Sequence, residues 1–379
     1  MPNRAAQKSR ISLVKCAAYK SAEVAAALEK AFALLGGIGV FITPGSKVLV
    51  KPNLLMAVPA SSGIVTHPEV VRAVIRELKK INCRVLLGDG PSAMNLGKER
   101  VERVYEATGM RLLAEQEGVE LVRFEKHRMR KGVPLSALLD ECDALVNVPK
   151  FKTHTLMFLS GAVKNLYGLV SGPYKTELHR RYFRPEQFAE VLADIYGSVK
   201  PALTVIDGIV AMEGDGPGTG GRLRSQGVLL VGRDCVALDS ALAFMAGVKP
   251  EGVLSNRAAA RKGLGNCDLN AIEVLGEPLE AVCDSAFRPP STSITAAIPG
   301  FLLAPLQRLM RFFKPKIDRL LCVRCGECVK ICPVKAVRFI DGYPRVEQGK
   351  CISCFCCHET CPARAIKIAK SWLARLMRL

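Results

Sequence analysis

The chain has 379 residues, 49% of them hydrophobic, so it is long enough for two domains and apolar enough to build a full core. Its 54 Lys and Arg residues outnumber 35 Asp and Glu residues, and the net charge of +19 favours an anionic partner. The one Trp, seven Tyr and fourteen Phe form no basic array interleaved with aromatic residues, which argues against nucleic acid as that partner.

Strand-like and helix-like patterns alternate over residues 1–285. Strands are predicted at 11–19, 47–55, 84–90, 119–125, 143–150, 202–210 and 227–232. Helices are predicted at 21–35, with Ser21 as N-cap, and at 67–80, 97–109, 188–199 and 239–248. This alternation predicts a large α/β domain with a mainly parallel sheet.

A basic segment follows the strand predicted to end near Val148. Between Lys150 and Arg184 there are seven Lys or Arg and two His, with Glu177 as the only acid. Because a buried lysine needs a partner and ligand sites lie at strand ends in such sheets, we interpret the segment as the wall of an anion site. Its lysines are then expected to face a ligand rather than a carboxylate of this chain. The alternative is a solvated basic helix face.

Other predicted strand ends supply further candidates for this site. The residues expected to bind the anionic substrate are Lys51, Asn53, His67, Lys150, Lys164, Asn165 and Lys175. The residues expected to act in catalysis are Lys152, His154 and His179, with a histidine as proton donor. Metal-assisted chemistry at His67, His154 and His179 is a weaker alternative. The glycines at 216, 218 and 221 fail the context of a nucleotide fingerprint and predict a flexible active-site loop or an anion nest.

Residues 286–318 are predicted to be a linker that contains a basic amphipathic segment, and residues 370–379 a basic amphipathic tail. Both could lie on an anionic membrane surface, or pack against the body of the protein or against a partner. Neither a signal peptide nor an apolar run long enough for a membrane span is evident, so we expect a cytoplasmic protein, peripheral to a membrane if these segments bind one.

Nine of the fifteen cysteines lie between Cys322 and Cys361. "CVRCGECVKICP" and "CISCFCCHETCP" are two copies of one C-x2-C-x2-C-x3-C-P motif, and each cysteine recurs 29 residues on. Residues 319–369 resemble the bacterial two-cluster ferredoxins, a small α+β fold with two [4Fe-4S] clusters. The resemblance implies Cys322, Cys325, Cys328 and Cys361 as ligands of one cluster, and Cys351, Cys354, Cys357 and Cys332 as ligands of the other. Two zinc sites are the alternative, which the third cysteine of each copy disfavours. Cys356 is surplus to the pattern.

Several segments together resemble the domain of unknown function 362 proteins, which are often fused to such a ferredoxin. They include "KPNLL", "THPEVV", "GDGPS", "NVPKFKTH", "GAVKNLYG", "IDGIVAMEGDGP" and "LDSALAFMAG". The resemblance implies an iron–sulfur protein but does not identify a substrate. Our first hypothesis is a reductase in which two clusters relay electrons from a donor protein to an anionic substrate in the α/β domain. The second is a non-catalytic electron-transfer or maturation subunit that docks an acidic protein or a membrane complex.

Overall fold

A ten-stranded mixed sheet forms the centre of the larger unit in this computed structural model, which describes residues 8–92, 97–293, 312–371 and 374–375. The strands run in the order β12-β1-β11-β10-β7-β2-β3-β4, and β8 pairs with both β10 and β9. Most neighbouring pairs are parallel; β1–β11, β10–β11 and β8–β9 are antiparallel. The predicted α/β class is confirmed. The strands are β1 (Ser9–Lys15), β2 (Lys47–Pro52), β3 (Arg84–Leu87), β4 (Glu120–Leu121), β7 (Ala144–Val148), β8 (Lys150–His154), β9 (Phe158–Ser160), β10 (Leu203–Gly214), β11 (Gly221–Gly232) and β12 (Ile272–Gly276).

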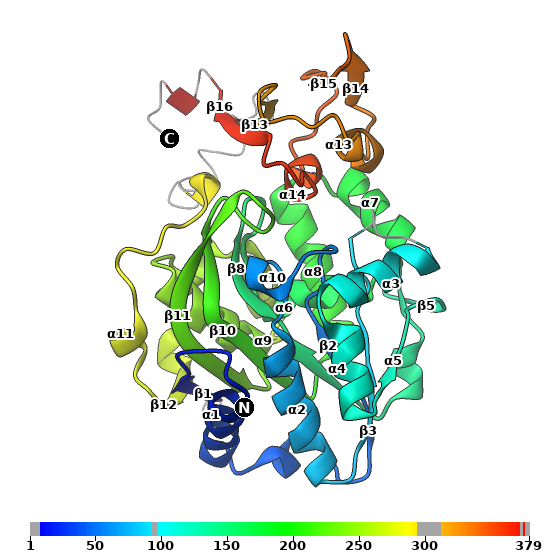
Figure 1. The fold of residues 1–379 in the computed structure, drawn as a ribbon. Helices are drawn as coiled ribbons and strands as arrows, with labels where there is room; N and C mark the ends of the chain where they lie inside the picture. Colours follow the sequence, from blue (N-terminus) through cyan, green and yellow to red (C-terminus); the bar gives the residue numbers. More distant parts are fainter. Residues whose placement is uncertain (1–7, 93–96, 294–311, 372–373, 376–379) are drawn as a thin grey trace.

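Helices cover both faces of this sheet (Figure 1). Successive strand residues point to opposite faces, so Val48 and Val50 pack in one core and Leu49 in the other. One face carries α1 (Ser21–Leu34), α2 (Pro68–Lys80), α3 (Lys98–Ala107) and α4 (Met110–Glu117); the other carries α6 (Ala162–Asn165), α8 (Pro185–Val199), α9 (Cys235–Met245) and α10 (Leu254–Arg261). The hairpin β5 (His127–Arg130) and β6 (Val133–Ser136) and the helices α5 (Leu138–Glu141), α7 (Gly172–Arg181) and α11 (Leu279–Val282) complete the unit.

Two local predictions in this unit need correction. Ser21 is the first residue of α1 and not its N-cap, which is Lys20. The Glu23 carboxylate, in the first turn, accepts hydrogen bonds from the backbone amides of Ala17 and Ala18, which precede the helix. The chain also does not leave the sheet at Lys150. It resumes as β8 after Pro149, and β8 lies beside the outer half of β10.

The C-terminal unit is a small α+β fold at one end of the α/β unit (Figure 1). Strand β13 (Phe313–Ile317) pairs with β16 (Ile366–Lys370), and β14 (Val337–Ile340) forms a hairpin with β15 (Tyr343–Val346). The short helices are α13 (Glu327–Ile331) and α14 (Cys356–Glu359). Helix α14 faces the α/β unit, and the hairpin projects on the far side.

The connecting segment is shorter than predicted, because residues 313–317 form β13 rather than part of the linker. Most of the predicted amphipathic segment within 286–318, and most of the tail at 370–379, lies outside the described residues. Within the described part of the tail, Ala374 is buried with Phe312 and Phe355 of the C-terminal unit.

Candidate functional site

Lys150 is neutralised within the chain. The register of β8 with β10 places Lys150 beside Asp207, and Nζ lies 2.9 Å from Oδ2 in a pair whose side chains are both at most 1% exposed. The Lys150 ammonium also donates to the Tyr19 hydroxyl at 2.5 Å. The prediction that Lys150 faces a ligand rather than a carboxylate of this chain is therefore wrong: the carboxylate is supplied by a strand 57 residues further along.

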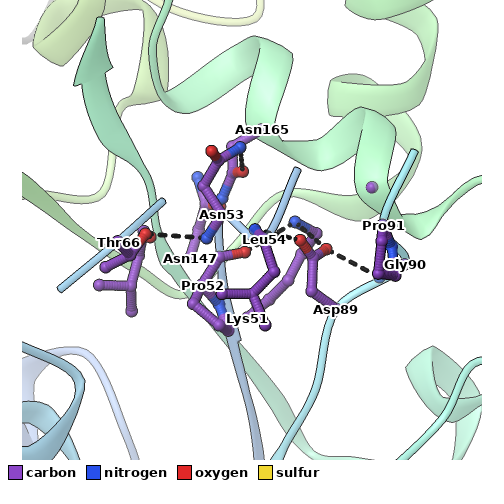
Figure 2. Close-up of polar contacts among 12 residues, drawn as sticks. Lys51, Pro52, Asn53, Leu54, Thr66, Asp89, Gly90, Pro91, Asn147 and Asn165 are labelled. Carbon is purple, nitrogen blue, oxygen red and sulfur yellow. Dashed lines mark hydrogen bonds and ion pairs between the residues drawn. The ribbon is translucent and has the colours of Figure 1, made fainter. Parts of the chain in front are cut away.

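Lys51 is paired in the same way. Its Nζ lies 2.7 Å from Asp89 Oδ1, and Asp89 also accepts the backbone amides of Leu54 and Gly90 (Figure 2). A Cβ at Gly168 would lie 2.4 Å from Asp89 Oδ1 and 2.6 Å from Lys51 Nζ, so this pair fits only against a glycine. Lys51 thus holds the strand-end loop that Asp89 begins, and its predicted role as an anion ligand is corrected.

Lys152 donates a hydrogen bond to the first of three linked side-chain amides. Its Nζ donates to Asn53 Oδ1 and to the Ile64 carbonyl, both at 2.7 Å. The Asn53 amide donates to Asn165, and Asn165 donates to Asn147, at 2.9 and 2.8 Å (Figure 2). Burial lowers the pKa of Lys152 to about 7. Asn53 and Asn165 line the cavity described next, whereas Lys152 lies behind Asn53; its predicted catalytic role becomes one of positioning.

A cavity of about 90 Å³ lies where the two units meet. The α/β unit contributes side chains from three places: the end of β2, the loop after β3, and the segment from α6 to α7. The C-terminal unit contributes α13 and α14. The polar residues in its wall are Asn53, Asp89, Ser92, Lys164, Asn165, Lys175, Thr176, His179, Glu359 and Thr360; Tyr167, Ile331 and Cys356 are among the others. Asn53, Lys164, Asn165, Lys175 and His179, five of the predicted site residues, thus line one cavity, which the C-terminal unit closes.

Lys164 is the cation most available to a ligand. Within the described residues its ammonium has neither a hydrogen bond nor an ion pair, and it lies 5.9 Å from the centre of the Tyr167 ring. Burial lowers the pKa of Lys164, and the carboxylate of Glu359 opposes that shift. Burial in turn raises the pKa of Glu359, against the nearby charge of Lys164. Lys164 is thus the one predicted anion ligand of the described residues that the structure leaves both unpaired and in the cavity wall.

Lys175 also lines the cavity but is engaged by the backbone. Its ammonium donates to the carbonyl oxygens of Gly90, Pro91 and Gly168, at 2.5, 2.8 and 3.3 Å. Burial lowers its pKa to about 7. Lys175 therefore joins α7 to the loop after β3, and any contact with a ligand must compete with three carbonyl oxygens.

The three histidines lie in three different environments. His179 lines the cavity, stacks on Phe188 and has its pKa lowered to about 3 by burial, so it is neutral. His154 is fully buried; its Nδ1 accepts two backbone amides, and Nε2 lies 3.2 Å from Glu359 Oε1. His67 caps α2 and stacks on Tyr19, away from the cavity. His67 is therefore outside the wall of this cavity, and within the described residues the three rings do not converge on one metal ion.

The glycine-rich loop between β10 and β11 is a docking surface for α14. A Cβ at Gly218 would lie 2.4 Å from the Glu359 carbonyl oxygen, and one at Gly220 would lie 2.5 Å from the His358 ring. His358 Nε2 is 2.9 Å from the Asp215 carbonyl oxygen, and the Thr219 hydroxyl donates to the Cys361 carbonyl at 2.7 Å. The expected active-site loop or anion nest is therefore a platform on which the C-terminal unit rests.

The cysteines fit iron–sulfur clusters. Cys322, Cys325, Cys328 and Cys361 line one small void together, as the ferredoxin resemblance implies, and none of the fifteen cysteines is in a disulfide. The two copies share their backbone form: positive φ recurs 29 residues apart, and the amides of Ala336 and Ala365 donate to the sulfurs of Cys332 and Cys361. The residue pairs with this recurring positive φ are Arg324 and Ser353, Gly326 and Phe355, and Lys335 and Arg364. Amides directed at sulfur and strained turns around it suit a thiolate-bound cluster.

Sequence reasoning missed the residues that the C-terminal unit gives to the cavity. Cys356, Glu359 and Thr360 occupy positions at which the second motif copy differs from the first, which has Glu327, Lys330 and Ile331 there. Every other non-cysteine position before the final proline also differs between the copies, so a comparison of the two copies does not single out this face.

Two family models match the chain. Residues 48–244 match the domain of unknown function (DUF362), and residues 314–362 match a 4Fe-4S dicluster domain. A thylakoid-associated protein of Synechocystis sp. (strain PCC 6803) is 30% identical over 282 residues, which cover 73% of this chain and 86% of that protein. No helix within the described residues is long and apolar enough to cross a membrane.

Proposed function

We propose, from the premise that this chain belongs to the domain of unknown function 362 (DUF362) family and carries a 4Fe-4S dicluster domain, that it is an iron–sulfur reductase of a small anionic substrate. A 4Fe-4S ferredoxin-type domain suggests electron transfer. The α/β unit would supply the substrate site, and a reduced one-electron carrier protein would supply the electrons.

The shared cavity wall carries this proposal. Cys356 lines the cavity and lies between Cys354 and Cys357, two expected ligands of the second cluster. Ile331, also in the wall, precedes Cys332, an expected ligand of the same cluster. A molecule in the cavity would therefore lie against the protein shell of one cluster and against the α/β side chains at once.

The side chains favour an anion of a few heavy atoms. Lys164 offers an unpaired ammonium, and Asn53 and Asn165 offer amides that Lys152 and Asn147 hold in place. Asp89 contributes no net repulsion because Lys51 neutralises it. Neutral His179 would hydrogen-bond to the substrate rather than protonate it, so protons would come from solvent.

The electrons balance for a two-electron reduction. Two clusters bound as the ferredoxin resemblance implies would supply one electron each, leaving both oxidised and the substrate reduced. Two equivalents of the reduced carrier would then restore them.

The test uses the anaerobically reconstituted full chain, reduced with titanium(III) citrate and mixed with a panel of small anions: nitrite, sulfite, pyruvate and oxalate. Reoxidation is followed by the visible absorbance of the clusters. At least one anion should reoxidise the protein with a saturable rate, and Lys164→Met should weaken its binding about 10- to 100-fold, the value of a charge-assisted hydrogen bond. The matched control Lys249→Met removes an exposed lysine that has no ion pair among the described residues.

Iron content must be equal in all three proteins for the comparison to hold. Reoxidation at equal rates in all three would mean that the anion reacts at an exposed cluster and not in the cavity. That result, or no reoxidation by any anion, would contradict the proposal.

A second candidate is a non-catalytic electron-transfer subunit at a membrane. It is favoured by the thylakoid association of the Synechocystis relative and by the basic segments at 286–318 and 370–379. Flotation with vesicles of phosphatidylserine, but not of phosphatidylcholine, together with a lack of anion turnover, would support it over the reductase.

A further inference from the structure

The two sets of cluster cysteines differ in exposure. In the set nearest the cavity Cys351, Cys354 and Cys357 are buried and Cys332 is partly exposed. In the other set Cys328 and Cys361 are buried, Cys322 is partly exposed and Cys325 is exposed. Cys322, Cys325, Cys328 and Cys361 lie together around one void that Pro344 of β15 also lines, and the β14–β15 hairpin projects away from the α/β unit (Figure 1). One set therefore lies next to the cavity, and the other is accessible to solvent at Cys325 and Cys322.

Large apolar side chains surround the exposed set. Leu320 is 97% exposed, Val323 65% and Phe339 46%, and Leu321 and Ile340 are exposed beside them. The Phe339 ring lies close to Gly326, the neighbour of Cys325 in the sequence: a Cβ added at Gly326 would be 3.5 Å from the Phe339 ring. We call Leu320, Leu321, Val323, Phe339 and Ile340 the distal face. A concentration of exposed apolar residues in one place indicates an interaction surface.

Two arginines give the distal face a positive charge. Arg319 and Arg324 lie over the Tyr343 ring, 5.3 and 4.8 Å from its centre, and Tyr343 pairs with Ile340 across the hairpin. Within the described residues neither arginine has a carboxylate partner, whereas Arg338 and Arg345 are paired with Glu347 and Asp341. Unpaired arginines on an aromatic platform, next to apolar residues, match the composition of protein interfaces.

We propose that the distal face is the docking site of an acidic one-electron carrier protein, which reduces the exposed cluster. The proposal rests on the proposed function, since it names the partner that supplies its electrons. In each encounter one electron passes from the carrier, which is oxidised, to the cluster, which is reduced. A small apolar patch with a charged border suits a transient complex, because electron-transfer interfaces are small and their association is steered by charge. A membrane is a poorer fit, since a lipid surface supplies no electrons.

The experiment measures the rate at which a reduced acidic ferredoxin of the plant type reduces the reconstituted full chain. Arg319→Glu/Arg324→Glu should lower the rate at low ionic strength about tenfold or more and flatten its dependence on salt. The matched control is Arg103→Glu/Arg257→Glu, on α3 and α10, which makes the same change in net charge at two exposed arginines without ion pairs among the described residues. Val323→Ser/Phe339→Ser tests the apolar part without any change of charge.

Reduction by titanium(III) citrate, which needs no docking, should be equal in every variant and shows that the clusters are intact. An equal loss of rate in the distal and control pairs would mean that net charge alone governs the reaction, and no loss in either pair would mean that electrons enter elsewhere. Binding to phosphatidylserine vesicles that the distal pair abolishes, with an unchanged ferredoxin rate, would make this a membrane face. Each of these results overturns the proposal that the distal face docks a carrier protein. The reductase proposal is tested independently, because the reaction of Lys164→Met with small anions uses titanium(III) citrate and needs no carrier protein.

Discussion

The ion pair between Lys150 and Asp207 permits a sharp test of the site's construction. Lys150→Met leaves a buried carboxylate without its counter-ion, which costs about 3–5 kcal/mol. The Tyr19 hydroxyl and the His67 amide still donate to Asp207, so we expect the lower end, about 3 kcal/mol. With an unfolding entropy of about 2.1 cal/mol/K per residue, this loss corresponds to a fall in Tm of about 4–5 °C for a unit of this size.

The reciprocal change and the double variant isolate the pair. Asp207→Asn leaves the Lys150 ammonium buried with the Tyr19 hydroxyl as its remaining acceptor, so a similar loss is expected. Lys150→Met/Asp207→Asn contains neither charge. It should therefore be more stable than the sum of the single changes by about 2–3 kcal/mol, a coupling that only contacting residues show.

The assay is thermal unfolding of the anaerobically reconstituted chain at one scan rate, with Lys249→Met as an exposed control that should stay within about 0.5 kcal/mol. Additive losses, or a Tm of Lys150→Met within about 1 °C of wild type, would refute the pairing. If Lys150 faced a ligand instead, Lys150→Met would lower anion affinity and leave Tm nearly unchanged.

Three further outcomes are expected. Gly218→Ala should displace α14 from the glycine-rich loop at a cost of about 1–3 kcal/mol, because the Glu359 carbonyl is backbone and cannot move away as a side chain would. Hydrogen exchange of the α14 amides should then become faster. The control Gly39→Ala, which has nothing within 4 Å of its added Cβ, should leave this exchange unchanged. The pKa of Lys152 is about 7 in the fold and about 10.4 when unfolded, so the unfolded chain binds the extra proton between these values. Stability should therefore rise with pH from about 7 to about 10, and Lys152→Met should reduce that rise in Tm. Cys356→Ser should keep the iron content of wild type, since the duplicated motif supplies eight ligands without Cys356; a loss of about half the iron would make Cys356 a ligand.

The sequence predicted what depends on local pattern. The alternation of apolar strands with helices predicted the α/β class, and helix 67–80 is confirmed as α2, with its Pro at the first turn and lysines in the last. Asp341 and Gly342 show another such local signal: an Asp-Gly pair favours a tight hairpin turn, and both residues have positive φ between β14 and β15.

What could not be predicted depends on register and on the contact between units. Lys150 and Asp207 lie far apart in sequence, and only the pairing of β8 with β10 brings them together. The sequence shows a surplus of basic residues between Lys150 and Arg184, but the counter-ions come from other segments. Glu359 reaches the cavity only because the C-terminal unit docks there, and no periodicity within a single chain reports such a contact.

The unequal exposure of the two cysteine sets has a consequence for the reduction potentials of the clusters. Solvent exposure is one of the factors that set the reduction potential of a four-iron cluster, and the motif copies otherwise present the same ligands. A pair of clusters held as proposed would therefore differ in potential although they arose from one duplicated segment. Such a difference in potential makes electron transfer between the two clusters favourable in one direction. The burial of one motif copy against the α/β unit would thus set the direction of electron flow in an otherwise duplicated segment.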